Sequence, residues 1–144
     1  MKPGKLYLIP TPIAEGDFNN FFPSFNAEII NDIDYYIVEE LRTARRFLRY
    51  AGIRKKIDEL QFFELNEHTQ GVELNEYLQP CLDGHNMGLM SEAGVPCVAD
   101  PGNKAVEKAH QLGIEVVPLI GPSSIILALM GSGLNGQNFV FHGY

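Results

Sequence analysis

The residues with the greatest capacity for chemistry lie between Met87 and Gly102. The apolar run Met87 to Met90 is followed by Ser91-Glu92-Ala93-Gly94, which places a hydroxyl and a carboxylate beside backbone with almost no side chain. Asp100-Pro101-Gly102 is typical of the start of a helix, because Asp is a good N-cap and Pro fits the first turn. A buried strand, a loop of small residues with one acid and a capped helix together form ligand sites in open α/β sheets. The alternative is a plain strand-to-helix connection, since such loops often contain Gly and Asp.

Apolar runs and helical periodicity predict the elements that position this loop. Strands are expected at residues 6–9, 34–38, 61–65, 87–90 and 114–120, with the start of a further strand at 139–141. Helices are expected between them at 25–33, 41–51, 74–82 and 100–112, and from residue 123, and Pro80 should weaken or kink the third of these. This alternation predicts an α/β fold in which a parallel sheet is covered by helices on both faces.

In a parallel sheet the loops that follow the strands meet at the carboxyl edge. We therefore expect the loops at Thr11, Glu39, Ser91 and Gly121 to converge. This convergence favours a ligand site over a plain connection. We also expect the space beside Gly94 to be open to a ligand, so that a side chain there would obstruct binding with little loss of stability.

The basic residues are concentrated in one short segment. Seven of the eleven Lys and Arg residues lie between positions 42 and 56, and Arg42, Arg45, Arg46 and Arg49 share one face of the helix expected at 41–51. We call these four residues the arginine stripe. It is either a solvated helix face or, on a protein of net charge -7, a phosphate-binding patch that residues 54–56 extend.

The composition limits the class of protein. A chain of 144 residues that is 45% hydrophobic is expected to form a single globular domain. Cys81 and Cys97 lack the spacing of a metal or redox pair and are interpreted as free thiols of a reducing cytosol. The four histidines show no ligand spacing, so no metal site is expected. We see no signal peptide and no run long enough to span a bilayer, which predicts a cytoplasmic protein with no membrane contact.

Several common site motifs do not occur. The turn after the first strand is Pro10-Thr11-Pro12, where a dinucleotide-binding or common methyltransferase fold would have G-x-G-x-x-G. There is also no P-loop G-x-x-x-x-G-K and no G-x-S-x-G nucleophile elbow. Phosphate cradling and serine hydrolysis therefore lack their usual motifs.

Three blocks in order instead resemble the tetrapyrrole methylase superfamily. They are Leu-Tyr-Leu-Ile-Pro-Thr-Pro-Ile at 6–13, Ser-Glu-Ala-Gly-Val-Pro at 91–96 with Asp-Pro-Gly at 100–102, and Val-Val-Pro-Leu-Ile-Gly-Pro-Ser at 116–123. Within the superfamily the chain is most similar to the bacterial 16S ribosomal RNA cytidine 2′-O-methyltransferases, from Lys5 to Tyr144.

The resemblance implies a fold and a cofactor. It implies a five-stranded parallel sheet in an N-terminal domain spanning residues 1–144, with the family's second α/β domain absent from this chain and a homodimer at full length. It also implies S-adenosylmethionine (SAM) as methyl donor. The cofactor positions that it carries over, together with Gly94 for its bare backbone, are Ile13, Ser91, Glu92, Ala93, Gly94, Pro96, Ser123 and Ser124.

The expected function is SAM-dependent methyl transfer, through in-line displacement, to a ribose 2′-hydroxyl of ribosomal RNA. A base must accept the hydroxyl proton, for which Glu39 and Glu92 are candidates and Glu40 and His68 weaker ones. Arg42, Arg45 and Arg49 are the expected substrate contacts. Two alternatives remain: methylation of a small molecule such as a tetrapyrrole precursor, which needs no basic patch, and a non-catalytic RNA- or nucleotide-binding domain.

Overall fold

A computed structural model describes all residues from Met1 to Tyr144. Its centre is a five-stranded sheet in the order β3-β2-β4-β1-β5, in which every pair of neighbours is parallel. The fold class predicted from the sequence is therefore confirmed. The strands are β1 (Lys5–Ile9), β2 (Tyr35–Val38), β3 (Gln61–Glu64), β4 (Met87–Met90) and β5 (Glu115–Pro118).

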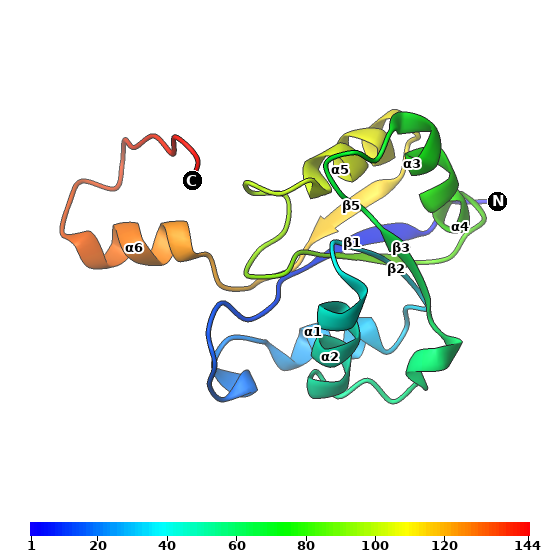
Figure 1. Ribbon diagram of the computed structural model, residues 1–144, viewed down its shortest axis with the longest axis horizontal. Coiled ribbons are helices and arrows are strands. Elements are labelled where there is room, and N and C mark those ends of the chain that lie inside the picture. Colours follow the sequence, from blue (N-terminus) through cyan, green and yellow to red (C-terminus); the bar gives the residue numbers. More distant parts are fainter.

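Helices cover both faces of the sheet, as Figure 1 shows. On one face lie α1 (Ser24–Ile30) and α2 (Leu41–Tyr50), and on the other lie α3 (Gly71–Tyr77), α4 (Gln79–Leu82) and α5 (Gly102–Gln111). Two short 3-10 helices that the sequence did not predict are η1 (Phe18–Asn20) and η2 (Ile57–Glu59). The last helix, α6 (Ser124–Ser132), projects away from the sheet (Figure 1).

Alternation along the strands divides the core into two clusters. Ile9 and Tyr36 pack with α1 and α2, whereas Leu6 and Ile37 pack with α3, α4 and α5. The central strand β4 is buried at all four positions. Its Gly88 is required because a Cβ there would lie 2.7 Å from the Ile9 side chain and 2.8 Å from the Tyr36 ring.

The clearest predicted helix is confirmed as α2. Glu40 is its N-cap and accepts hydrogen bonds from the backbone N–H groups of Arg42, at 2.9 Å, and Thr43, at 2.6 Å. Gly52 follows the helix with a φ of +80°, a conformation that favours glycine. The helix expected at 74–82 is divided into α3 and α4 next to Pro80, as the missing proline N–H predicts.

The C-terminal segment differs from the sequence-based expectation. Residues 139–141 form no strand and are exposed, so the expected further strand was wrong. These residues lie beyond α6, away from both edge strands (Figure 1), and an apolar run without a neighbouring strand has no ladder of hydrogen bonds to join. No residue of α6 is buried. None of the helices has the length and apolar character required to cross a bilayer.

Candidate active site

The loops after β1, β4 and β5 are joined by backbone hydrogen bonds at the carboxyl edge of the sheet. The N–H and C=O groups of Thr11 and Gly94 bond each other at 3.0 Å in both directions. The N–H of Val95 donates to the carbonyl oxygen of Pro122 at 3.0 Å. The predicted convergence is therefore confirmed. These hydrogen bonds hold together three loops that are far apart in the sequence.

Glu39 joins the loop after β2 to the same assembly. Its Oε2 accepts a hydrogen bond from the backbone N–H of Glu92 at 3.0 Å. Burial of the Glu39 carboxyl raises its pKa; the Glu92 N–H lowers that pKa, and the negative charges of Asp100 and Glu92 raise it further. A carboxylate with a raised pKa is a better proton acceptor than an ordinary one, so Glu39 has the chemistry of a general base.

The larger of two cavities at this edge lies between the loops after β1 and β2 and helix α2. Its volume is about 510 Å³, which is within the range of small-molecule sites. Aromatic side chains line one part, and charged side chains line another. The aromatic residues are Phe18, Phe21, Phe47 and Tyr50; the charged ones are Glu15, Glu39, Glu40, Arg46 and Glu92.

The smaller cavity has a volume of about 170 Å³. The loop at 91–95 contributes to both cavities. Of the eight sequence-predicted cofactor residues, Ser91 and Glu92 line the larger cavity, and Pro96 is buried and lines neither. The other five line the smaller cavity: Ile13, Ala93, Gly94, Ser123 and Ser124.

The structure corrects the expectation for Gly94. Its φ is +73°, and a Cβ there would lie 3.0 Å from the Ile13 side chain and 3.1 Å from the carbonyl oxygen of Pro122. The hydroxyl of Ser91 also donates to the carbonyl oxygen of Gly94 at 3.0 Å. The space and the backbone groups of Gly94 are thus used by the protein itself, and a side chain there would disturb the loop assembly before it met a ligand.

Ala93 and the start of α6 are the polar groups left open at the smaller cavity. Ala93 is exposed, and its N–H has no acceptor in the protein. Ser123 is the N-cap of α6 and accepts from the N–H of Ile126 at 3.4 Å. The N–H groups of Ser124 and Ile125 belong to the first turn and have no intrahelical acceptor, so this end of α6 favours an anion.

The segment that follows the loop at 91–95 has a strained backbone. Cys97 and Ala99 have φ values of 72° and 59°, which are uncommon for residues other than glycine. Asp100 holds this turn by accepting from the N–H groups of Cys97, at 2.9 Å, and Gly102, at 2.8 Å. The sequence predicts Asp100 as the N-cap with Pro101 in the first turn, but Pro101 is the N-cap and α5 begins at Gly102, one residue later than expected. Burial raises the pKa of Asp100 and raises that of the Cys97 thiol to about 12, and both cysteines are free.

The arginine stripe is exposed along its whole length, but its members have different surroundings. Arg46 is the member that lines the larger cavity. The guanidinium of Arg45 lies over the Phe62 ring, 5.7 Å from its centroid. None of the three expected substrate contacts, Arg42, Arg45 and Arg49, lines either cavity.

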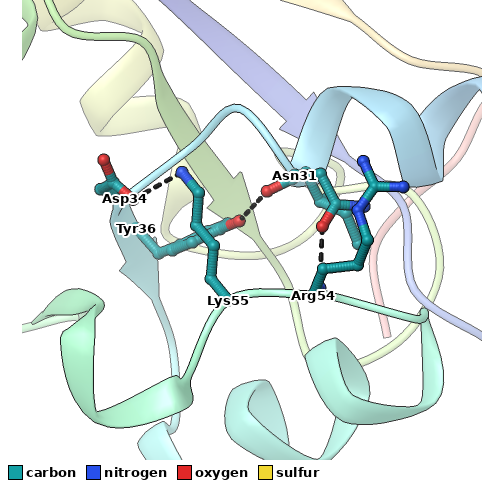
Figure 2. Close-up of polar contacts among 6 residues, drawn as sticks. Asn31, Asp34, Tyr36, Arg54 and Lys55 are labelled. Carbon is teal, nitrogen blue, oxygen red and sulfur yellow. Dashed lines mark hydrogen bonds and ion pairs between the residues drawn. The ribbon is translucent and has the colours of Figure 1, made fainter.

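The expected extension of the stripe lies at the other edge of the sheet. Lys55 forms an ion pair with Asp34 at 2.6 Å, directly before β2 begins, and the Arg54 N–H donates to the Asn31 side chain at 2.8 Å (Figure 2). The amino ends of parallel strands are opposite the site loops. Arg54 and Lys55 therefore stabilise the corner between α1 and β2, and none of residues 54–56 lines either cavity.

The two weaker candidates for the base are placed unfavourably. Glu40 uses both carboxylate oxygens to cap α2, and its hydrogen bonds, the one from the Thr43 hydroxyl first, lower its pKa. His68 is exposed in the loop before α3 and lines neither cavity.

The sequence analysis did not predict the aromatic side chains that line the larger cavity. Three phenylalanines in the short loop Phe18 to Phe22 were a visible signal of them.

Comparison with known proteins yields a consistent set of relatives. The chain is 33% identical over 140 residues to ribosomal RNA small subunit methyltransferase I of Vibrio cholerae, covering 96% of this chain and 46% of that protein. Over nearly its whole length the chain is similar to proteins named ribosomal RNA small subunit methyltransferase I. The protein of that name from Escherichia coli O157:H7 is 32% identical over 98% of this chain and 46% of its own length, and the Synechocystis protein 33% over 98% and 48%.

These matches confirm the resemblance drawn from the three sequence blocks. The chain spans about half the length of the curated relatives it matches. No protein-family model matches the chain.

Proposed function

We propose that this chain is part of a SAM-dependent methyltransferase that modifies a ribose 2′-hydroxyl of small-subunit ribosomal RNA. The observation that carries the proposal is the 30–33% identity, over nearly the whole chain, to relatives named ribosomal RNA small subunit methyltransferase I. The adjacent cavities at the carboxyl edge give support, because methyl transfer requires a donor and an acceptor to be held side by side. Processing of ribosomal RNA also supports a cytoplasmic location.

The smaller cavity fits one end of SAM. The N–H of Ala93 and the first turn of α6 present donors that suit the carboxylate of the methionine end, and Ser124 adds a hydroxyl. A volume of about 170 Å³ is below the usual range for a whole cofactor, so these residues would hold only part of it. When bound, SAM supplies a methyl group on a positively charged sulfur.

Glu39 is the favoured general base. The Glu39 carboxylate would accept the proton of the 2′-hydroxyl while that oxygen takes the methyl group, which SAM would supply with the electrons of the carbon–sulfur bond left on its sulfur. One oxygen of Glu39 is held by the Glu92 N–H, and the other accepts no hydrogen bond from the protein. Glu92 stays a second candidate because it lines the same cavity and is exposed.

We also propose that the second domain expected from the family completes the SAM site, and that the working enzyme is a homodimer. The exposed apolar side chains of α6 support additional contacts there, since Ile126 and Met130 are 50% and 76% exposed. Sedimentation of the enzyme at its full length tests the dimer, and a monomer at micromolar concentration would contradict it.

The decisive experiment is methyl transfer by a chimera in which residues 1–144 replace the matching part of the Vibrio cholerae relative. Labelled SAM and small ribosomal subunits that lack the modification are supplied, and the methylated nucleoside is identified after digestion. We expect a 2′-O-methylated nucleoside. Label on a small molecule, or subunit binding without transfer, would support the alternative functions instead. The chain alone, under the same conditions, shows how much of the activity these residues provide.

A further inference from the structure

One asparagine of α1 is buried. Asn26 lies in the first turn of this helix and is only 1% exposed. The other buried residue of α1 is Ile30, which belongs to the apolar core. An apolar side chain would serve packing equally well at position 26, because a buried amide is costly unless it is hydrogen-bonded. The amide group of Asn26 therefore points to a specific partner.

That partner is the backbone of the loop after β5. The side-chain NH2 group of Asn26 donates to the carbonyl oxygen of Ile120 at 2.9 Å, across 94 positions of the sequence. The side chain of Ile120 is 80% exposed and does little to hold this residue in place. The N–H of Leu119 still donates to the carbonyl oxygen of Leu8 in β1, and beyond Leu119 the loop leaves the sheet. Asn26 thus holds the loop at the point where the sheet no longer does.

The residues that follow Ile120 lead directly to the smaller cavity. A Cβ at Gly121 would overlap Pro10, so the loop passes in close contact with the end of β1. The carbonyl oxygen of Pro122 then accepts from the Val95 N–H at 3.0 Å, and Ser123 caps α6. A shift of the Ile120 carbonyl would therefore be transmitted to the start of α6.

Helix α6 has little packing of its own to fix its direction. None of its residues is buried, and the helix projects away from the sheet (Figure 1). Its first residues, Ser124 and Ile125, line the smaller cavity. The direction of their N–H groups is therefore set by the loop that precedes the helix, which Asn26 holds at Ile120.

We propose that Asn26 is a positioning residue of the cofactor site. Its hydrogen bond to Ile120 fixes the path of the loop after β5, and this loop aims the first turn of α6 at the carboxylate of the methionine end of SAM. Asn26 itself lines neither cavity. This inference rests on the proposed function, since it requires the smaller cavity to hold that end of the cofactor. The alternative is that Asn26 contributes to stability alone.

Two asparagines at opposite ends of α1 provide matched variants. Asn26→Leu keeps a side chain that branches at the same carbon, but it removes the N–H donor. Asn31 follows α1 at the corner shown in Figure 2, where its side chain donates to the carbonyl oxygen of Ala27 at 2.9 Å and accepts from the Arg54 N–H at 2.8 Å. Asn31→Ala therefore removes buried or half-buried hydrogen bonds of α1 at a place that lines neither cavity.

Hydrogen exchange of the 144-residue chain tests the positioning without any ligand. The Val95 N–H reports on the loop after β5, and the Gly94 N–H, which donates to Thr11, is the reference within the same molecule. In Asn26→Leu we expect exchange at Val95 to become about tenfold faster than at Gly94, as for the loss of one hydrogen bond. In Asn31→Ala both amides should change by the same factor. Equal acceleration of the two amides in Asn26→Leu would overturn the proposal.

The amide spectra show whether each variant has kept the fold. If Asn26→Leu does not fold, Asn26→Ala takes its place, because it leaves space where the longer apolar side chain crowds its neighbours. Loss of the fold in both variants would make Asn26 a residue of the core only and would overturn the proposal.

Binding of S-adenosylhomocysteine to the chimera tests the link to the cofactor. Calorimetry should show a dissociation constant about tenfold higher for Asn26→Leu and unchanged for Asn31→Ala. The value of kcat at saturating SAM should stay within about twofold of the parent, because binding is weakened alike in the ground state and the transition state. Unchanged affinity in Asn26→Leu would refute the inference. A chimera that binds S-adenosylhomocysteine as expected but transfers no methyl group would refute the proposed function instead.

Discussion

The two cavities at the carboxyl edge are built in different ways. The smaller one lies beside loops whose backbones bond each other, at Thr11 with Gly94 and at Val95 with Pro122. The larger one is formed by side chains that leave ring faces and carboxylate oxygens unused, among them those of Phe21 and Glu39. A backbone-built site has a fixed shape, whereas a site of unused side chains has reactive and selective groups. This difference supports our proposal that the smaller cavity holds one reactant in place and that the larger cavity contains the groups that react.

Removing the proposed base should have the largest effect. In the chimera, Glu39→Gln is expected to slow methyl transfer about 100-fold or more, because general base catalysis typically contributes at least this factor. The parent rate should rise with pH through the raised pKa of Glu39, and the variant should lose this dependence. Single-turnover rates across pH are the measurement.

Glu92→Gln is the matched control, because Glu92 lines the same cavity. It should keep most of the rate. If Glu92→Gln is the slow variant and Glu39→Gln is not, the assignment of the base is reversed.

The fixed shape of the smaller cavity is tested at Gly94. Gly94→Ala should lower the free energy of unfolding by about 3 kcal/mol, since a positive φ and a crowded Cβ both oppose the change. Gly52→Ala has a similar φ of +80° but nothing within 4 Å of its Cβ, and should lose only about 1 kcal/mol. Urea unfolding of both variants measures the difference. Equal losses would show that the loops around Gly94 relax without strain.

The arginine stripe allows a test of whether RNA binds next to the larger cavity. Replacing Arg45 and Arg49 together by Gln should weaken binding to small subunits and reduce the log–log salt slope by about two units, with SAM affinity unchanged. Arg46→Gln, at the rim of the larger cavity, should reduce the slope by about one unit and also slow methyl transfer. The measurement is the affinity of each protein for small subunits across a series of salt concentrations. Identical slopes in all three proteins would make the stripe a solvated surface and favour a small-molecule substrate.

The smallest effect concerns stability at the larger cavity. Because the pKa of Glu39 is raised by folding, the folded state binds more protons than the unfolded one, and stability is lost as pH rises from the ordinary value of 4.5 through the raised pKa. Glu39→Gln removes this loss. The variant should therefore be slightly more stable than the parent at pH 7 and equal to it when the carboxyl is protonated in both states. Thermal unfolding at pH 4 and pH 7 tests this, and a less stable variant at pH 7 would contradict it.

The sheet, its parallel arrangement and the edge at which the loops meet are all predictable from the amino-acid sequence. Short apolar strands such as Met87 to Met90, alternating with helical periodicity, are compatible with few other folds, and α2 was predicted almost to the residue because its apolar face, Gly52 and the arginine stripe agree. The motif blocks also identified which loops matter. These features depend on local pattern, which a single sequence contains.

The direction in which each side chain of those loops points depends instead on contacts between distant segments of the chain. The sequence placed Gly94 beside open space, but Ile13 and Pro122 come from distant parts of the chain and fill it. The sequence also did not show that the cofactor residues are divided between two cavities. It did not show that Arg46 is the member of the stripe that lines the larger cavity, or that Phe21 lines it too. Residues 139–141 have a strand-like sequence yet form no strand, because a strand exists only where a neighbour supplies its hydrogen bonds. Contacts between distant segments are set by packing, and no local pattern records them.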